Sequence, residues 1–201
     1  MDSTRQQRFT FEPVKTIRGT TILLLLGCSI ACAQQGSSKA VPYRAKNGMV
    51  VSQEVQASEV GCEILRQGGN AVDAAVATAF ALAVTHPAAG NIGGGGFMVV
   101  MLENGKSTTF DFRERAPAAS HPRMFLDEKG KYDPARHHFS HIAVGVPGSV
   151  AGLHLAHRRL GRLPWKKLLE PAVKLAGDGF RVSPGLAADL AGRLGSFKKY
   201  P

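Results

Sequence analysis

The sequence predicts an α+β fold in which an antiparallel β-hairpin lies between two groups of helices. The first observation behind this prediction is an alanine-rich apolar segment of helical length at residues 71–84. The second is the pair Asn104-Gly105 between two apolar runs, which is the strongest short-range signal for a hairpin. The third is a series of helix starts after the hairpin, of which two are marked by Pro164 and Pro184.

The composition is that of a globular protein, because the 201 residues are 44% hydrophobic and 20% charged. This length suits one domain or part of a larger one. The formal net charge is +10, but the basic residues are scattered and lack the interleaved aromatics and motifs of nucleic-acid-binding proteins. The sequence therefore argues against nucleic acid as a partner, while its charge favours anionic ligands.

Residues 1–33 have the pattern of a targeting segment. Basic residues precede an apolar run at 20–31 that is too short to span a bilayer comfortably, and residues 31–33 offer an Ala-x-Ala cleavage site. Residues 25–28 also resemble a bacterial lipobox, which would place a lipid on Cys28. We predict a signal peptide or lipoprotein leader and an exported protein, periplasmic or extracellular, either free or lipid-anchored. The alternative is an uncleaved anchor or a buried apolar strand.

The globular part is expected to follow a linker. Residues 34–47 are mostly small and polar, as in linkers, and globular patterning covers 48–201. The short apolar run at 48–52 predicts a strand. A helix is predicted at 54–67, ended by a glycine cap at 68–69.

The next predicted helix, residues 71–84, begins after Asn70, a good N-cap, and has Asp73 near the positive end of its dipole. Its residues are almost all small or apolar, so we expect it to be buried on all sides. His86-Pro87 is expected to end it.

The hairpin strands are predicted at residues 97–102 and 107–112. Three helices are expected after them, at 150–160, at 164–176 and from 184 onwards.

Four consecutive glycines, Gly93–Gly96, separate the apolar helix from the hairpin. Glycine in such density indicates a sharp turn or a close approach of backbones, although a flexible connector is an alternative. The run follows a helix and precedes a strand, which is the reverse of a dinucleotide-binding turn, and it lacks the lysine of a phosphate-binding loop. We therefore predict no nucleotide cofactor, and we expect the run to let the chain pass close to the sheet.

A cluster of charges, residues 111–117, ends the second strand. Arg113 or Arg115 could present a planar fork of donors to a carboxylate, and strand alternation predicts these two on one face with Glu114 on the other. An ordinary solvated cluster is the alternative. Asp111 and Glu114 are expected to point to opposite faces, so they are not a general acid-base pair.

His137, His138 and His141 have some resemblance to a metal site. Their spacing matches no strong metal motif, and no carboxylate or thiol lies at ligand spacing. We interpret them as structural or surface histidines and predict no metal.

The motifs together resemble the γ-glutamyltranspeptidase (glutathione hydrolase) family, in its order and at its spacings, over roughly residues 47–195. The motifs that carry the resemblance are Gly48-Met-Val50, Gly68 to Val76, Thr85-His-Pro87, Gly90 to Met98, Asp111-Phe-Arg-Glu114 with Ala116-Pro117, and Gly145-Val-Pro-Gly148.

The resemblance implies a partial N-terminal-nucleophile hydrolase, whose complete fold is an αββα sandwich of two antiparallel sheets between helical layers. Members are made as one precursor that cuts itself into a large and a small subunit. The new N-terminal threonine of the small subunit attacks the γ-glutamyl amide of glutathione or a related γ-glutamyl compound, and the acyl-enzyme passes to water or an amino acid. This chain would be the N-terminal portion of the large subunit, with the small catalytic subunit as its partner.

The resemblance assigns substrate binding to Arg113, which would hold the α-carboxylate of the γ-glutamyl group, and to Glu114, which would support the same pocket. Arg115 has no implied role. The nucleophile belongs to a Thr-Thr-His context, whereas Thr21 is followed by Ile22 and Thr109 by Phe110. We therefore expect no catalytic residue in this chain and no activity from it alone.

Two alternatives stay open. One is a related N-terminal-nucleophile amidase or acylase, or a capsule-processing relative, that acts on other amides. The other is a non-catalytic exported module that keeps only the glutamate-binding arginine.

Overall fold

The structure, a computed structural model, describes residues 41–199, and the chain divides into two units, Met1–Arg44 and Ala45–Pro201. The predicted leader with Cys28 lies outside the described residues, as does the predicted linker up to residue 40. Residues 41–44 of the first unit are irregular and exposed.

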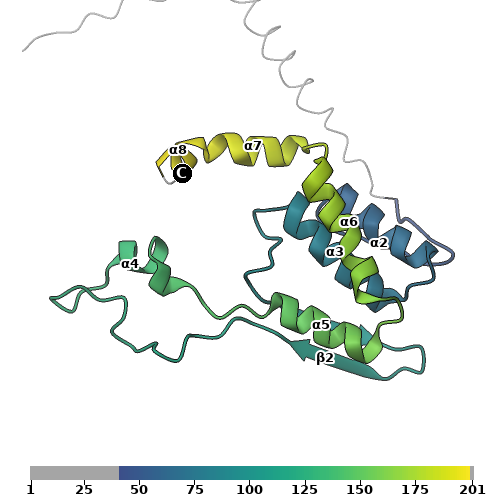
Figure 1. Ribbon diagram of the computed structural model, residues 1–201, viewed down its shortest axis with the longest axis horizontal. Coiled ribbons are helices and arrows are strands. Elements are labelled where there is room, and N and C mark those ends of the chain that lie inside the picture. Colours follow the sequence, from purple (N-terminus) through teal and green to yellow (C-terminus); the bar gives the residue numbers. More distant parts are fainter. Residues whose placement is uncertain (1–40, 200–201) are drawn as a thin grey trace, which may run out of the picture. The chain divides into compact units, whose positions relative to one another are not determined.

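The second unit contains all the helices and strands of the described part of the chain (Figure 1). In chain order they are α2 (Val55–Arg66), α3 (Ala71–Thr85), β1 (Phe97–Met101), β2 (Ser107–Asp111), α4 (Pro134–His138), the 3₁₀ helix η2 (His141–Ala143), α5 (Ser149–Leu160), α6 (Trp165–Asp178), α7 (Pro184–Gly192) and α8 (Leu194–Lys199).

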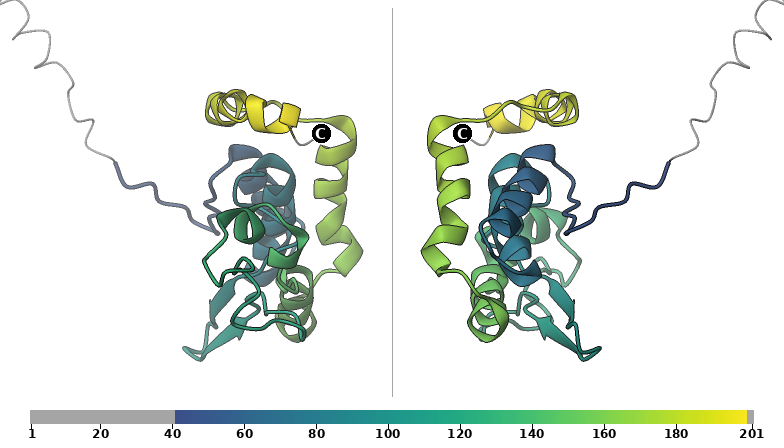
Figure 2. Two further views of the ribbon diagram at one scale, coloured as in Figure 1. Left: turned by 90° about the vertical axis from the view of Figure 1, so that its left-hand side faces the viewer. Right: turned by 90° about the vertical axis from the view of Figure 1, so that its right-hand side faces the viewer.

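Helix α3 lies at the centre of the packing. It contacts α2, α5 and α6, and Figure 2 shows α6 running along the α2–α3 pair. Val76 and Ala77 in α3 are fully buried, as are Ile64 of α2 and Leu168 of α6. The small side chains of α3 allow its neighbours to approach closely. The predicted burial on all sides is wrong for one face of the helix, because Ala71 and Ala75 are exposed and Ala79 is half-buried.

Asp73 ties the start of α3 to the connection between α5 and α6. The Asn70 side chain caps α3 by accepting from the backbone N–H groups of Val72 and Asp73, both at 3.0 Å, and the Asp73 carboxylate accepts from Asn70 N–H at 2.9 Å. The same carboxylate accepts from Arg162 N–H at 3.0 Å and Leu163 N–H at 3.3 Å. Asp73 is fully buried, so this reciprocal cap also serves as a tertiary link.

Strands β1 and β2 pair antiparallel, from Phe97 opposite Asp111 to Met101 opposite Ser107, which confirms the predicted hairpin. Gly105 in the turn has φ +78°, a conformation that favours glycine. Phe110 is 5% exposed and packs toward the helices, whereas the outward-facing side chains of β1 are exposed. The hairpin therefore has one covered face and one open face, and on the open face the apolar side chains of β1 lie opposite Ser107, Thr109 and Asp111 of β2.

The strand predicted at residues 48–52 is wrong for the described part of the chain, where this segment is neither helix nor strand. Its side chains keep the alternation of a strand, because Met49 and Val51 are exposed and Val50 is half-buried against the core. The single sheet among residues 41–199 consists of β1 and β2. The segment has the sequence of a strand without a neighbouring strand to complete a hydrogen-bond ladder.

The helices predicted after the hairpin are confirmed as α5, α6 and α7. Pro164 is the N-cap of α6 rather than its first residue, and the Ser183 hydroxyl caps α7 by accepting from Leu186 N–H at 3.2 Å. Helices α4, η2 and α8 were not predicted, because each is short and contains no buried residue. Among residues 41–199 there is no helix with the length and apolar character needed to cross a membrane.

Candidate functional site

The candidate site is built on residues 112–115, where the chain leaves β2. Phe112 extends the hairpin by one pair, since its N–H donates to Gly96 O at 3.0 Å. The Asp111 carboxylate then accepts from Arg113 N–H at 3.0 Å and turns the chain. Arg115 forms an isolated antiparallel bridge with Val146, with N–H···O distances of 3.2 and 2.8 Å. The short segment that bears Arg113 is therefore held at both ends.

The Arg113 side chain is 64% exposed, and its Nε lies 3.2 Å from Oε2 of Glu114. Its guanidinium carbon lies 5.9 Å from the centroid of the Phe97 ring. The predicted alternation, with Glu114 on the opposite face from Arg113, is therefore wrong. Strand β2 ends at Asp111, so strand geometry no longer separates consecutive side chains.

Arg113, Glu114 and Arg115 line an open groove of about 440 Å³. The rest of its lining also comes from the segment between β2 and α5 and includes His137 and Ile142. The groove brings together a guanidinium, a carboxylate and apolar side chains, which are the groups that orient a small polar ligand.

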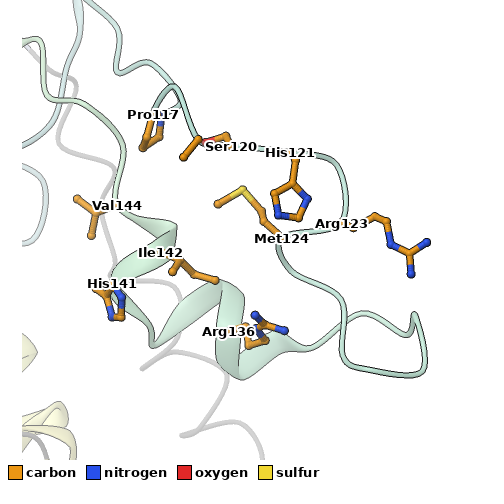
Figure 3. A pocket seen from close by; sticks show the side chains of 10 residues that line it. Pro117, Ser120, His121, Arg123, Met124, Arg136, His141, Ile142 and Val144 are labelled. Atoms are coloured by element: carbon orange, nitrogen blue, oxygen red, sulfur yellow. The ribbon is translucent and has the colours of Figure 1, made fainter.

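A second concavity, of about 500 Å³, lies in the same segment (Figure 3). Its lining includes His121, Arg123, Arg136 and His141, and it shares Ile142 with the groove. In Figure 3 Arg123 points away from the other labelled side chains, and the Arg136 Nη1 donates to the carbonyl of Leu126 at 2.7 Å. Both arginines are thus directed toward the protein's own backbone or the exterior.

The three histidines singled out in the sequence are divided between different contacts. The Tyr132 hydroxyl lies 2.6 Å from Nδ1 of His137 and 3.3 Å from Nε2 of His138, and the two imidazoles stack with centroids 4.5 Å apart. His141 lines the second concavity. Within residues 41–199, His, Cys, Asp and Glu side chains form no group of three or more that could hold a metal ion.

The glycine run packs against the segment that bears Arg113. The Gly94 carbonyl accepts from the N–H groups of Gly148 and Ser149, at 2.7 and 2.9 Å. A Cβ at Gly95 would lie 2.5 Å from the carbonyl oxygen of Phe112, closer than side-chain atoms approach in real structures. The expected close approach to the sheet is confirmed, and the run is a packed element rather than a free connector.

Sequence reasoning assigned no role at this site to Asn91 or Gly152. Asn91 Oδ1 accepts from Gly94 N–H at 2.6 Å and lies 3.2 Å from the Ser149 hydroxyl, which donates to it. Gly148 and Gly152 are four residues apart at the start of α5, so they lie on one face of the helix, and this spacing was the available signal.

Known proteins match this chain in sequence and in structure. Residues 57–201 match the family described as Gamma-glutamyltranspeptidase. The chain is 55% identical over 149 residues to the glutathione hydrolase proenzyme of Escherichia coli K12, covering 74% of this chain and 26% of that protein.

Two solved structures extend the likeness to the fold. The crystal structure of Helicobacter pylori gamma-glutamyltranspeptidase has a TM-score of 0.76 and 45% identity, covering 80% of this chain and 46% of that one. The Bacillus anthracis transpeptidase enzyme CapD has a TM-score of 0.59 and 33% identity, with coverages of 74% and 46%.

The chain spans about a quarter of the length of the curated relatives that it matches. The match nevertheless includes both the helices around α3 and the segment that bears Arg113. This chain belongs to the γ-glutamyltranspeptidase family.

Proposed function

We propose that this chain is the N-terminal part of the large subunit of an exported glutathione hydrolase. The full-length protein would transfer the γ-glutamyl group of glutathione and related compounds to water or to amino-acid acceptors. The observation that carries the proposal is Arg113, whose guanidinium lines a groove within the region matched by the family.

Arg113 would bind the α-carboxylate of the γ-glutamyl group through charge-assisted hydrogen bonds. Glu114, with Oε2 at 3.2 Å from the Arg113 Nε, would hold the guanidinium in one orientation before the substrate arrives. Both side chains are exposed in this chain. The remainder of the protein would cover the groove and exclude water, which strengthens such contacts.

The covalent step would need a residue that this chain lacks. The hydroxyl of a threonine at a new N-terminus would attack the γ-carbonyl carbon, while its α-amino group takes the hydroxyl proton and delivers it to the departing amine. The amide C–N bond breaks and an ester to the threonine forms. Water or an amino acid then attacks the ester and restores the hydroxyl. This chain would supply the residues that bind the substrate α-carboxylate, and not the nucleophile.

We also propose that the open face of the hairpin receives the second sheet of an αββα sandwich. Phe97, Val99 and Met101 are 66%, 75% and 77% exposed on β1, an apolar row that would be costly to leave in water. Residues 48–52, which have the alternation of a strand, would gain a ladder partner in the same assembly. Export would follow from the leader at residues 1–33, with lipid attachment at Cys28 as a variant of it.

The proposal predicts that the purified 201-residue chain releases no glutamate from glutathione, because none of its threonines stands in the nucleophile's context. A full-length version that contains the downstream Thr-Thr-His sequence should release glutamate. A coupled glutamate assay on both proteins measures the difference. Glutamate release by the short chain at a rate similar to that of the full-length protein would refute the assignment of the nucleophile.

A glutamate-binding module is the second candidate, and it is favoured by one observation. The groove with Arg113 and Glu114 is formed within this chain. Calorimetric titration of the chain with glutamate separates the two functions. Strong binding by the chain alone favours the module, whereas binding only after the rest of the protein is present favours the enzyme.

A further inference from the structure

Phe112, the residue before Arg113, occupies a socket made of four glycines, Gly95, Gly96, Gly148 and Gly152. A Cβ placed at Gly152 would lie 2.1 Å from the Phe112 Cγ and 2.2 Å from its Cβ. On the other side, a Cβ at Gly96 would lie 3.0 Å from the Phe112 Cε2. The ring therefore lies where two glycines leave room for it.

The backbone of Phe112 is enclosed in the same way. A Cβ at Gly148 would lie 2.0 Å from the Phe112 carbonyl oxygen and 3.3 Å from that of Arg113, and one at Gly95 would lie 2.5 Å from the Phe112 oxygen. The two halves of the socket are joined, because the Gly94 carbonyl accepts from Gly148 N–H at 2.7 Å. The start of α5 and the glycine run thus both pack against the peptide group between Phe112 and Arg113.

A side chain at position 152 could not be accommodated by turning the phenylalanine ring. The close contact includes the Phe112 Cβ, whose position is set by the backbone and not by the side-chain torsions. Either α5 or the chain at Phe112 would have to move. Since Arg113 is the next residue, and its N–H is held by Asp111, its guanidinium would move with that backbone.

We propose that Gly148 and Gly152 are positioning residues for Arg113, an inference that rests on the proposed function. Because they have no side chains, they would allow Phe112 to pack against the first turns of α5. This packing would fix the position at which the guanidinium binds the substrate α-carboxylate. They would touch no substrate themselves. Their effect would therefore appear only with donors that carry this carboxylate.

The test is Gly152→Ala in the full-length protein. We expect the KM for a γ-glutamyl donor to rise roughly 10- to 100-fold with a smaller change in kcat, as for a displaced binding group. With a γ-aminobutyryl donor, which lacks the α-carboxylate, the variant and the wild type should have equal kcat/KM. Gly177→Ala is the matched control, because a Cβ at this glycine of α6 would meet no atom within 4 Å, and its KM should stay at the wild-type value.

A second variant keeps the test decisive if Gly152→Ala does not fold. Phe112→Leu adds no atoms to the socket but fills it less well, and we expect a smaller rise in KM that is again confined to the carboxylate-bearing donor. A wild-type KM in the folded variants, or an equal loss with both donors, would overturn the proposal. If Arg113→Ala itself leaves the KM unchanged, the proposed function has failed and the socket has no role in binding. If Arg113→Ala raises the KM but Gly152→Ala and Phe112→Leu do not, the carboxylate-binding role of Arg113 stands and the positioning role of the socket is refuted.

Discussion

Replacing Arg113 by alanine in the full-length protein is expected to raise the KM for γ-glutamyl donors strongly. The loss of charge-assisted hydrogen bonds to a carboxylate costs about 2–3 kcal/mol, which corresponds to roughly a 30- to 150-fold change. The contact would be the same in the ground state and in the transition state, so kcat should change much less than KM. Initial-rate kinetics over a range of donor concentrations measures both constants.

Two further variants separate specific binding of the carboxylate by Arg113 from a general effect of positive charge in the groove. Arg113→Lys keeps the positive charge but loses the planar fork, so its KM should lie between those of the wild type and the alanine variant. Arg115→Ala removes a neighbouring guanidinium that lines the same groove, and its KM should stay near the wild-type value. Unchanged donor kinetics in Arg113→Ala, or an equal effect of Arg115→Ala, would count against the carboxylate-binding role.

The largest expected effect on stability is that of Asp73→Ala. The variant removes a fully buried carboxylate and leaves the partly buried N–H groups of Asn70, Arg162 and Leu163 without their acceptor. Donors that lose their partner in such an environment are costly, and we expect the free energy of unfolding to fall by about 2–4 kcal/mol. Urea unfolding followed by the fluorescence of Trp165, the single tryptophan, measures this, because its ring lies 5.5 Å from that of Phe80 in the core.

Asp189→Ala is the matched control for this measurement, since Asp189 is an exposed aspartate on α7. Its urea midpoint should equal that of the unaltered chain. The tertiary link assigned to Asp73 is contradicted if the midpoint of Asp73→Ala is likewise unchanged. An Asp73→Asn variant keeps the size of the side chain but has one acceptor oxygen instead of two. Its urea midpoint should lie between those of Asp73→Ala and Asp189→Ala.

The local elements of this protein were predictable from its sequence, because their signals lie within a few residues of one another. Asn70 and Asp73 form the expected cap of α3, and Gly68 ends α2 with φ +88°. The Asn104-Gly105 pair produces the hairpin with the expected strands. Arg113 could be singled out because a linear motif carries it, and a motif needs no knowledge of the fold.

The sequence also suggested features that depend on distant partners, and there it was insufficient. Residues 48–52 have a strand pattern, yet a strand forms only when another strand completes its hydrogen bonds. The ion pair between Arg113 and Glu114 forms where β2 ends at Asp111, and the segment that carries it is held from outside by the bridge between Arg115 and the distant Val146.

The sequence by itself determined the longer helices α2, α3, α5, α6 and α7, the hairpin and the identity of the arginine, since periodicity, caps and turn residues act over one or two turns of chain. Tertiary structure alone decided that the Asp73 carboxylate would accept hydrogen bonds from the α5–α6 connection, 89 residues further along the chain. It also decided that Phe112 would lie between glycines from two separate segments. These contacts depend on which backbones approach each other, and such distances are set by packing between elements that no local pattern encodes.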